Sequence, residues 1–136
     1  RPAPKVVEAA AMVIVQATAA GPLVLLGRRP ALGRWPGLWQ PPMIEGEGAD
    51  ATLHAWAVGA GFVPGAKLPP LVHILTHRRY QVRSQVAHCN GTSDPALPSL
   101  LDHEPLRWWP LDDALSRGRG LSRLAVRLLE QAQQQT

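Results

Sequence analysis

The sequence predicts a single domain of the α+β class, a mixed β-sheet sandwich with one short internal helix and one helix at the C-terminus. Three observations lead to this prediction. The chain has 136 residues, which is enough for one hydrophobic core and too few for two. Its composition, 46% hydrophobic and 18% charged, is typical of folded globular proteins. Strand-like apolar segments stand on both sides of a helix-like segment, which indicates sheet and helix in one unit.

The chain is expected to open with a linker and two β-strands. Residues 1–4 include two prolines, which favour a linker, so the domain is expected to span residues 5–134. Residues 6–15 are apolar and rich in β-branched side chains, which predicts a buried strand. A second short strand is expected at residues 23–26, paired with the first across a turn at residues 19–22.

A structured loop and a short helix are predicted next. Residues 28–42 are rich in proline and glycine and include Trp35 and Trp39, which are expected either to pack under the loop as core or to offer faces for base stacking. Residues 51–60 place apolar side chains three or four positions apart, which predicts an amphipathic helix that Gly61 ends. The apolar stripe consists of Leu53, Trp56, Ala57 and Ala60.

The second half of the chain is expected to return to strands and to finish in a helix. Residues 72–77 and 82–86 alternate in polarity, which predicts two strands joined around the Arg-Arg-Tyr of residues 78–80. Residues 90–98 have the composition of a loop. A strand ending at Trp108-Trp109-Pro110, a helical turn beginning at Asp112 and Asp113, and a helix over residues 121–134 complete the chain.

The C-terminal helix is expected to supply much of the core. Its apolar residues recur at helical spacing and form one stripe. Three tryptophans outside the loop are also assigned to the core because of their large apolar area. These expected core residues are Leu121, Leu124, Ala125, Leu128 and Leu129 in the helix, together with Trp56, Trp108 and Trp109.

The composition argues against a membrane protein and against a disulfide-stabilised one. The longest apolar stretch, residues 9–15, is far shorter than the ~20 residues that span a bilayer, so no membrane partner is expected. Cys89 is the single cysteine, so it forms no internal disulfide and cannot alone build a zinc or iron–sulfur site. A reducing compartment and no structural metal are therefore expected.

Basic residues are unevenly distributed along the chain. The net charge is +4, and residues 51–93 contain no acidic side chain. Such a stretch is typical of a surface that meets nucleic acid or phosphate, although without a motif an ordinary basic surface fits equally well. Its basic residues are Lys67, Arg78, Arg79, Arg83, His54, His73, His77 and His88.

No residue pattern of a catalytic centre is present. Glu45, Glu47 and Asp50 are close in sequence, but they lie in a glycine-rich turn, which favours a solvated loop over a metal site. The chain has no glycine-rich phosphate loop followed by lysine, no serine in an elbow motif and no close pair of histidines. We therefore expect no catalytic residue and no metal site in this chain.

Four segments share their order and spacing with a known family. Arg28-Arg29-Pro30 leads through a turn-rich loop to Gly37-Leu38-Trp39, and Leu75-Thr76-His77 follows. Trp109-Pro110-Leu111-Asp112 and a Leu-Ser-x5-Leu-Leu pattern over residues 121–129 complete the set. Together these segments resemble the C-terminal domain of MutY-type adenine DNA glycosylases, a Nudix-like domain that lacks Nudix catalysis. The resemblance covers essentially the whole chain.

The chain departs from the family pattern at acidic and aromatic positions. The family's first loop continues with an acidic residue, Phe and Pro, where this chain has Gln40-Pro41-Pro42. The family's Phe-Ser/Thr-His loop has Leu75 in place of its aromatic residue. The resemblance implies a Nudix-like mixed-sheet sandwich with a short degenerate Nudix helix and a C-terminal helix.

The internal helix lacks the carboxylates with which Nudix hydrolases hold metal. Those enzymes, which the domain resembles in fold, carry Arg-Glu and then Glu-Glu on this helix, followed by Gly and an apolar residue. When that ending is aligned on Gly61-Phe62, His54 and Ala55 replace Arg-Glu, and Val58 and Gly59 replace the glutamate pair. Without carboxylates Mg²⁺ cannot be held against a pyrophosphate, so hydrolysis is not expected.

The resemblance implies a role in reading damaged DNA, namely recognition of 8-oxoguanine opposite mispaired adenine in base-excision repair. Oxidation makes N7 of guanine a donor and adds a carbonyl at C8. The Thr76 hydroxyl can donate and accept hydrogen bonds, and the His77 imidazole can donate one. Without the resemblance, the simpler interpretation is that these two residues only end a strand. Arg78 and Arg79 are expected to hold flanking phosphates. The implied DNA-binding residues are Leu75, Thr76, His77, Arg78, Arg79, Arg28 and Arg29.

The same resemblance implies partners and a larger protein. The expected partners are duplex DNA with an 8-oxoguanine–adenine mispair and an N-terminal glycosylase domain of the same chain. That domain would hold the catalytic carboxylates and, usually, an iron–sulfur cluster, so no cofactor is expected in this C-terminal fragment. It is expected to be a cytoplasmic monomer at the bacterial nucleoid.

Two alternatives to this function remain open. They are a stand-alone Nudix-fold nucleotide pyrophosphohydrolase with an unconventional metal site and a Nudix-fold protein-interaction module.

Overall fold

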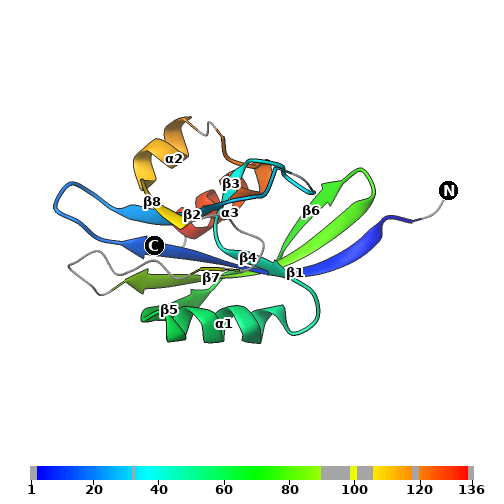
Figure 1. Cartoon of the computed structure of the whole chain (residues 1–136), viewed down its shortest axis with the longest axis horizontal. Coiled ribbons are helices and arrows are strands. Elements are labelled where there is room, and N and C mark those ends of the chain that lie inside the picture. The colour runs from blue at the N-terminus through cyan, green and yellow to red at the C-terminus, as the bar shows by residue number, and fades with distance from the viewer. Residues whose placement is uncertain (1–2, 32, 90–98, 101–105, 118–119, 135–136) are drawn as a thin grey trace.

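A computed structural model describes residues 3–31, 33–89, 99–100, 106–117 and 120–134. These residues form a mixed sheet with helices, which confirms the predicted α+β fold (Figure 1). The elements in chain order are β1 (Lys5–Gln16), β2 (Leu23–Arg28), β3 (Trp39–Gln40), β4 (Met43–Glu45), α1 (Ala49–Gly59), β5 (Phe62–Lys67), β6 (Leu71–Leu75), β7 (Arg78–Cys89), β8 (Leu106–Pro110), α2 (Leu111–Arg117) and α3 (Arg123–Gln134).

Two long strands, β1 and β7, form the centre of the sheet. They run parallel, in a register that extends from Lys5 opposite Arg78 to Val15 opposite His88. On its other side β1 pairs antiparallel with β2, which confirms the predicted hairpin of the first two strands. β1 also pairs antiparallel with β4. β2 continues the sheet through β3 and β8. β7 pairs with β6 near its start and with β5 near its end.

The central strand β1 is apolar on both faces because each face is covered. Alternate residues of a strand point to opposite sides. Ala9, Ala11 and Val13 join the core that includes α3, whereas Met12 and Ile14 join the core that includes α1. Figure 1 shows the two helices on opposite sides of the sheet. This double burial covers residues 9–14 and explains why residues 9–15 form a continuous apolar run.

Both predicted main helices are confirmed, with small differences at their ends. α1 begins two residues before the predicted segment and ends at Gly59, with Ala60 as its C-cap. Gly61 comes next with φ of 87°, a left-handed value that glycine adopts without strain. α3 begins at Arg123 rather than Leu121 because the Ser122 hydroxyl accepts a hydrogen bond from the Ala125 N–H at 3.0 Å and caps the helix. The predicted stripe, including Leu121 ahead of the helix, is buried.

The predicted position of the second hairpin turn is wrong. Thr76 and His77 form the turn, and residues 78–80 are the first residues of β7. The parallel pairing with β1 explains the difference, because it gives residues 78–80 a strand partner on each side. Tyr80 is fully buried at this position.

Three further predictions compare with the structure in different ways. The loop predicted at residues 28–42 contains the short strand β3. Residues 3–4 have no regular structure, whereas residues 1–2 of the predicted linker and the predicted loop at 90–98 lie outside the described residues. Among the residues that the structure describes, no helix is long and apolar enough to cross a membrane.

Candidate nucleic-acid interface

The β6–β7 hairpin extends to one end of the molecule, beside the start of β1 (Figure 1). Leu75 pairs with Arg78, so Thr76 and His77 are the two residues of the turn, and both are exposed. The backbone N–H of Lys5 donates to the His77 carbonyl at 3.1 Å. This bond ties the tip of the hairpin to β1 and leaves the Thr76 hydroxyl and the His77 imidazole facing solvent.

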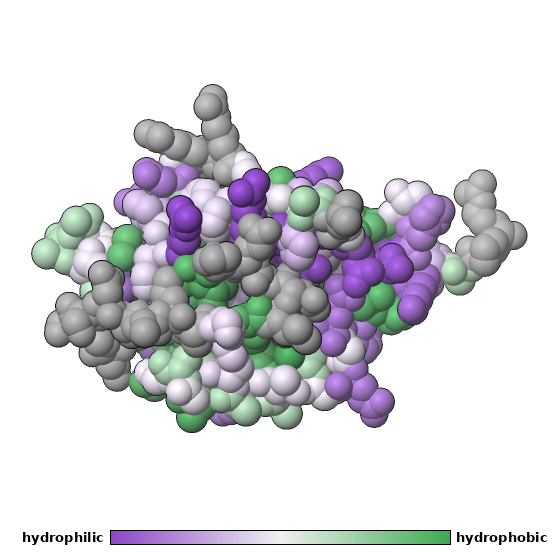
Figure 2. Space-filling model, in the orientation of Figure 1, coloured by the Kyte–Doolittle hydropathy of each residue, from purple (hydrophilic) through white to green (hydrophobic). Residues whose placement is uncertain are grey.

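Cationic side chains from two strands meet at this tip. Lys5 lies beside Arg78, and Val6 lies beside Arg79. Neighbours in register share a face of the sheet, so Lys5 and Arg78 lie on one face and Arg79 lies on the other. Arg79 is exposed and Arg78 is half-buried. Figure 2 shows hydrophilic side chains gathered toward this end, whereas the surface over α1 is pale to green. The tip thus places a hydroxyl and an imidazole between cations on two faces.

The two predicted arginines of the first loop have different surroundings. Arg28 ends β2, and its Nε donates to the Gly37 carbonyl at 3.1 Å, so its guanidinium closes the loop. The backbone of Arg29 also joins the two sides of this loop, since its N–H donates to the Leu38 carbonyl at 2.8 Å. The Arg29 side chain lies near enough to Tyr80 to influence its pKa, as does Arg78. Arg28 therefore has a structural contact within this loop, and the charge of Arg29 acts on Tyr80 of β7.

The charges of three arginines, Arg34, Arg78 and Arg29, act on the buried tyrosine Tyr80. Burial, and then the carboxylate of Glu45, raise the pKa of Tyr80, whereas the charges of Arg34, Arg78 and Arg29 act in the opposite direction. The Arg34 guanidinium lies 5.8 Å from the centre of the Tyr80 ring and pairs with Glu45. Sequence reasoning missed Tyr80, Arg34 and Lys5. A family motif marks none of the three, and their positions depend on long-range pairing.

His73, one of the basic residues of the acid-free stretch, faces the core rather than the solvent. Arg127 Nη1 lies 3.0 Å from His73 Nδ1. Because arginine only donates, Nδ1 accepts this hydrogen bond and the ring proton stands on Nε2. Burial, and then the charges of Arg127 and Arg123, lower the pKa of His73 below its ordinary value. The side chain is therefore a neutral packing element and adds no charge to the tip.

The loop tryptophans pack inward. Trp35 is 8% exposed and belongs to the core, with its ring centre 4.9 Å from that of Tyr80. Its φ of 51° is a left-handed value that a bulky residue rarely adopts, so tertiary packing holds it there. Trp39 is half-buried and lies 5.3 Å from Trp109. Of the two alternatives predicted for the loop tryptophans, core packing and base stacking, core packing therefore holds for Trp35. Trp56, Trp108 and Trp109 are partly buried against the core, as predicted.

The residues of α1 do not fit a divalent metal. Ala55, Val58 and Gly59 occupy the aligned glutamate positions and offer no side-chain oxygen. Glu45 pairs with Arg34 and is partly buried in β4, so the expected solvated loop is wrong for this residue. Asp50 lies on α1 and pairs with Arg83. Within the described residues no three His, Cys, Asp or Glu side chains come together to hold a metal ion.

Comparisons with known proteins assign the domain type. A family model described as "NUDIX domain" matches residues 10–131. A comparison with curated protein sequences finds no match. Solved structures that resemble the chain cover nearly all of it at low sequence identity, so their likeness concerns the fold alone.

Three of these solved structures show the range of proteins that share the fold. The NUDIX domain of Shewanella oneidensis NrtR complexed with ADP ribose has a TM-score of 0.70 and 18% identity, and the match covers 99% of this chain and 90% of that one. A Caenorhabditis elegans Ap4A hydrolase has a TM-score of 0.67 and 18% identity, with 94% and 96% covered. The C-terminal domain of mouse MUTYH, in complex with human PCNA, has a TM-score of 0.57 and 22% identity, with 96% and 90% covered.

Proposed function

The chain belongs to the NUDIX domain family, and we propose that it is a non-catalytic Nudix domain that recognises 8-oxoguanine opposite mispaired adenine in duplex DNA. The hairpin tip carries the proposal. There, Thr76 and His77 are exposed between Lys5, Arg78 and Arg79. The likeness to the MUTYH domain supports it, since that protein shares the fold.

The donors and acceptors at the tip suit the oxidised edge of guanine. In 8-oxoguanine N7 donates and the C8 oxygen accepts, whereas N7 of guanine accepts. The Thr76 hydroxyl would accept from N7–H, and the His77 imidazole would donate to the C8 oxygen. Lys5 and Arg78 on one face of the tip, and Arg79 on the other, would contact phosphates on either side of the lesion. Guanine has no C8 oxygen, so the His77 imidazole would lose its acceptor, and the Thr76 hydroxyl would have to turn and donate to N7.

The chemistry of adenine excision would lie in a separate glycosylase domain of the same protein. The described part of the chain has no cluster of carboxylates for it. An iron–sulfur cluster needs several thiolates, and Cys89 is the single cysteine of the sequence, so such a cluster does not fit these residues. The domain would act as a monomer on DNA at the bacterial nucleoid in the cytoplasm.

The proposal is tested by titrating the chain with two labelled duplexes, one with 8-oxoguanine opposite adenine and one with guanine in its place. We expect tighter binding to the lesion duplex. Replacing Arg78 and Arg79 by glutamine should weaken binding to both duplexes and reduce the slope of log Kd against log salt by about two, because each lost phosphate contact releases about one counterion fewer. The ratio of the two affinities should stay unchanged, because phosphate contacts carry no sequence information.

Arg107→Gln is the matched control for this experiment. Arg107 is exposed on β8, which pairs with β2 on the other side of β1 from β7. Its loss should leave the salt slope unchanged. A reduction of the slope by about one in the control, as for one lost phosphate contact, would show that any lost charge has this effect and would contradict phosphate binding at the tip. Equal affinity for the two duplexes would contradict lesion recognition, and no DNA binding at all would favour a protein-interaction module.

A second candidate function is nucleotide hydrolysis, which the likeness to the Ap4A hydrolase favours. The composition of α1 argues against it, because Ala55, Val58 and Gly59 provide no metal ligands. We expect no release of product from 8-oxo-dGTP, dATP or ADP-ribose in the presence of Mg²⁺, measured by chromatography of the nucleotides. Turnover that a chelator abolishes would establish the hydrolase instead.

A further inference from the structure

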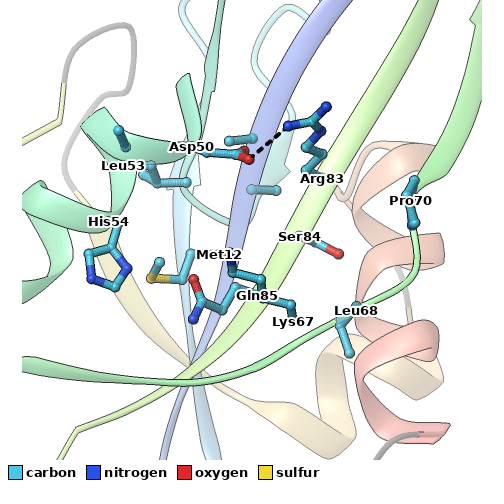
Figure 3. A pocket seen from close by; sticks show the side chains of 13 residues that line it. Met12, Asp50, Leu53, His54, Lys67, Leu68, Pro70, Arg83, Ser84 and Gln85 are labelled. Carbon is cyan, nitrogen blue, oxygen red and sulfur yellow. Dashed lines mark hydrogen bonds and ion pairs between the residues drawn. The ribbon is translucent and has the colours of Figure 1, made fainter. Parts of the chain in front are cut away.

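A cavity between α1 and the sheet is not used by the hairpin tip. Its volume is about 510 Å³, which lies within the range of small-molecule pockets. Figure 3 shows its walls, which come from α1, from β1 and β7, and from the segment that links β5 to β6. All residues that line it belong to the described part of the chain.

The floor of this cavity is apolar. Ala10 and Met12 of β1, Leu53 of α1 and Leu68 of the linking segment line it, and each is less than a tenth exposed. A ring or other flat apolar group laid on this floor would remove apolar surface from water without displacing a polar partner. The floor therefore suits the apolar body of a ligand rather than an isolated ion.

Polar side chains stand around this floor from several elements. His54 comes from α1, Lys67 ends β5, and Arg83 and Gln85 come from β7, while Asp50 of α1 is the single carboxylate. The side chains of Lys67 and His54 make no hydrogen bond or ion pair with any described residue. A few convergent polar groups around an apolar floor are the composition of a ligand site. Here the excess of donors and cations favours an anion.

The basic residues of this cavity are distinct from those of the hairpin tip. Arg79 and Arg83 lie on the same face of β7 because they are separated by an even number of residues. Arg83 stands six residues beyond His77, which in a strand is roughly 20 Å from the turn, so it lies on another part of the surface. His54, Lys67 and Arg83 are thus a second group within the acid-free stretch that DNA recognition leaves without a role.

Arg83 can exchange its present partner for a ligand at little cost. Its Nη1 lies 3.3 Å from Asp50 Oδ2, and the two side chains are 68% and 48% exposed. So exposed a pair adds little stability, because water screens it. Figure 3 shows this pair at one end of the cavity, with Met12, Gln85 and His54 further along it.

We propose that the cavity binds an organic phosphate, a phosphate monoester on a flat apolar body. The body lies on the floor of Met12 and Leu53, and the phosphate accepts hydrogen bonds from Lys67 and Arg83. The His54 imidazole and the second amide hydrogen of Gln85, whose Nε2 already donates to the Gly65 carbonyl at 2.9 Å, supply further donors. A phosphate with three free oxygens uses this set of donors more fully than a carboxylate does.

The test uses phenyl phosphate as the probe, titrated into the ¹⁵N-labelled chain and followed by NMR. Phenol and inorganic phosphate are titrated separately for comparison. We expect phenyl phosphate to bind at least about tenfold more tightly than either part alone, because it engages both floor and donors. The amide signals of Ala51, Leu68 and Gln85 should move. Lys67→Gln with Arg83→Gln should weaken phenyl phosphate binding at least about tenfold, as the loss of two charge-assisted hydrogen bonds requires.

Two further variants keep the test decisive. Ala51 is exposed and lines the cavity, so Ala51→Trp should fill it and remove binding without changing any charge. Arg107→Gln, which removes a cation far along the sheet on β8, should leave binding unchanged. Phenyl phosphate binding that survives Ala51→Trp, or that is no tighter than binding of inorganic phosphate, would overturn the proposal. DNA titrations of the same variants report on the hairpin tip independently.

Discussion

Replacement of both Thr76 and His77 by alanine is expected to reduce the preference of the chain for the 8-oxoguanine duplex over the guanine duplex by about tenfold or more. A good contact to a base edge contributes about 1–3 kcal/mol of discrimination, and this variant removes two. The measurement is the ratio of Kd values for the two duplexes at constant salt. The salt slope should stay unchanged, because the variant retains Arg78, Arg79 and Lys5.

The backbone of the turn should tolerate this change. Trp35 is the single non-glycine residue with positive φ in the described ranges, so Thr76 and His77 have ordinary backbone angles that alanine adopts. The melting temperature should hardly move, since both side chains are exposed.

The matched control is Thr52→Ala with His88→Ala, which removes an exposed hydroxyl and an exposed imidazole from α1 and from the far end of β7. An unchanged ratio in the turn variant would assign lesion recognition to other residues. An equal loss on both duplexes, together with a lower melting temperature, would show that the turn acts only in folding.

Truncation of Leu128 to alanine is expected to lower the free energy of unfolding by about 2–5 kcal/mol. Leu128 is 1% exposed on α3 and belongs to the core that joins this helix to β1 and β7. Its loss removes buried apolar surface and leaves a cavity that the packed neighbours refill only in part. Urea unfolding monitored by tryptophan fluorescence measures the change.

Val58→Ala provides the comparison for this truncation. Val58 is 51% exposed on α1, so its change should stay within about 0.5 kcal/mol. A Leu128 variant with the stability of the Val58 variant would show that α3 contributes little to the core. The expectation that this helix supplies much of the core would then be wrong.

The fold was largely predictable because its elements have strong local patterns. The apolar run of residues 6–15, the stripe of α1 and the stripe of α3 each reflect burial that repeats at the period of a strand or a helix. That α1 has no side-chain oxygen at Ala55, Val58 and Gly59 can also be read directly from the sequence. Each of these features depends only on residues that are close together in the sequence.

The hairpin shows where such reasoning fails. Alternation predicted two strands, but it placed Arg78 and Arg79 in the turn rather than in β7. Their place in the strand depends on the parallel pairing with β1, whose partner residues lie more than seventy positions earlier. A pairing so distant leaves no periodic signal near residue 78, because side-chain alternation is the same whichever strand lies alongside.

The sequence by itself therefore determined the class of fold, most of its elements and the residue types at the expected metal-ligand positions of α1. Only the tertiary structure decided which charges meet: Lys5 with Arg78 at the tip, Arg34 with Glu45 beside Tyr80, and Arg83 with Asp50 at the cavity. The physical reason is that burial imposes a short period on the sequence, whereas contacts between strands depend on register. Register is set by the packing of the whole core, which no single segment contains.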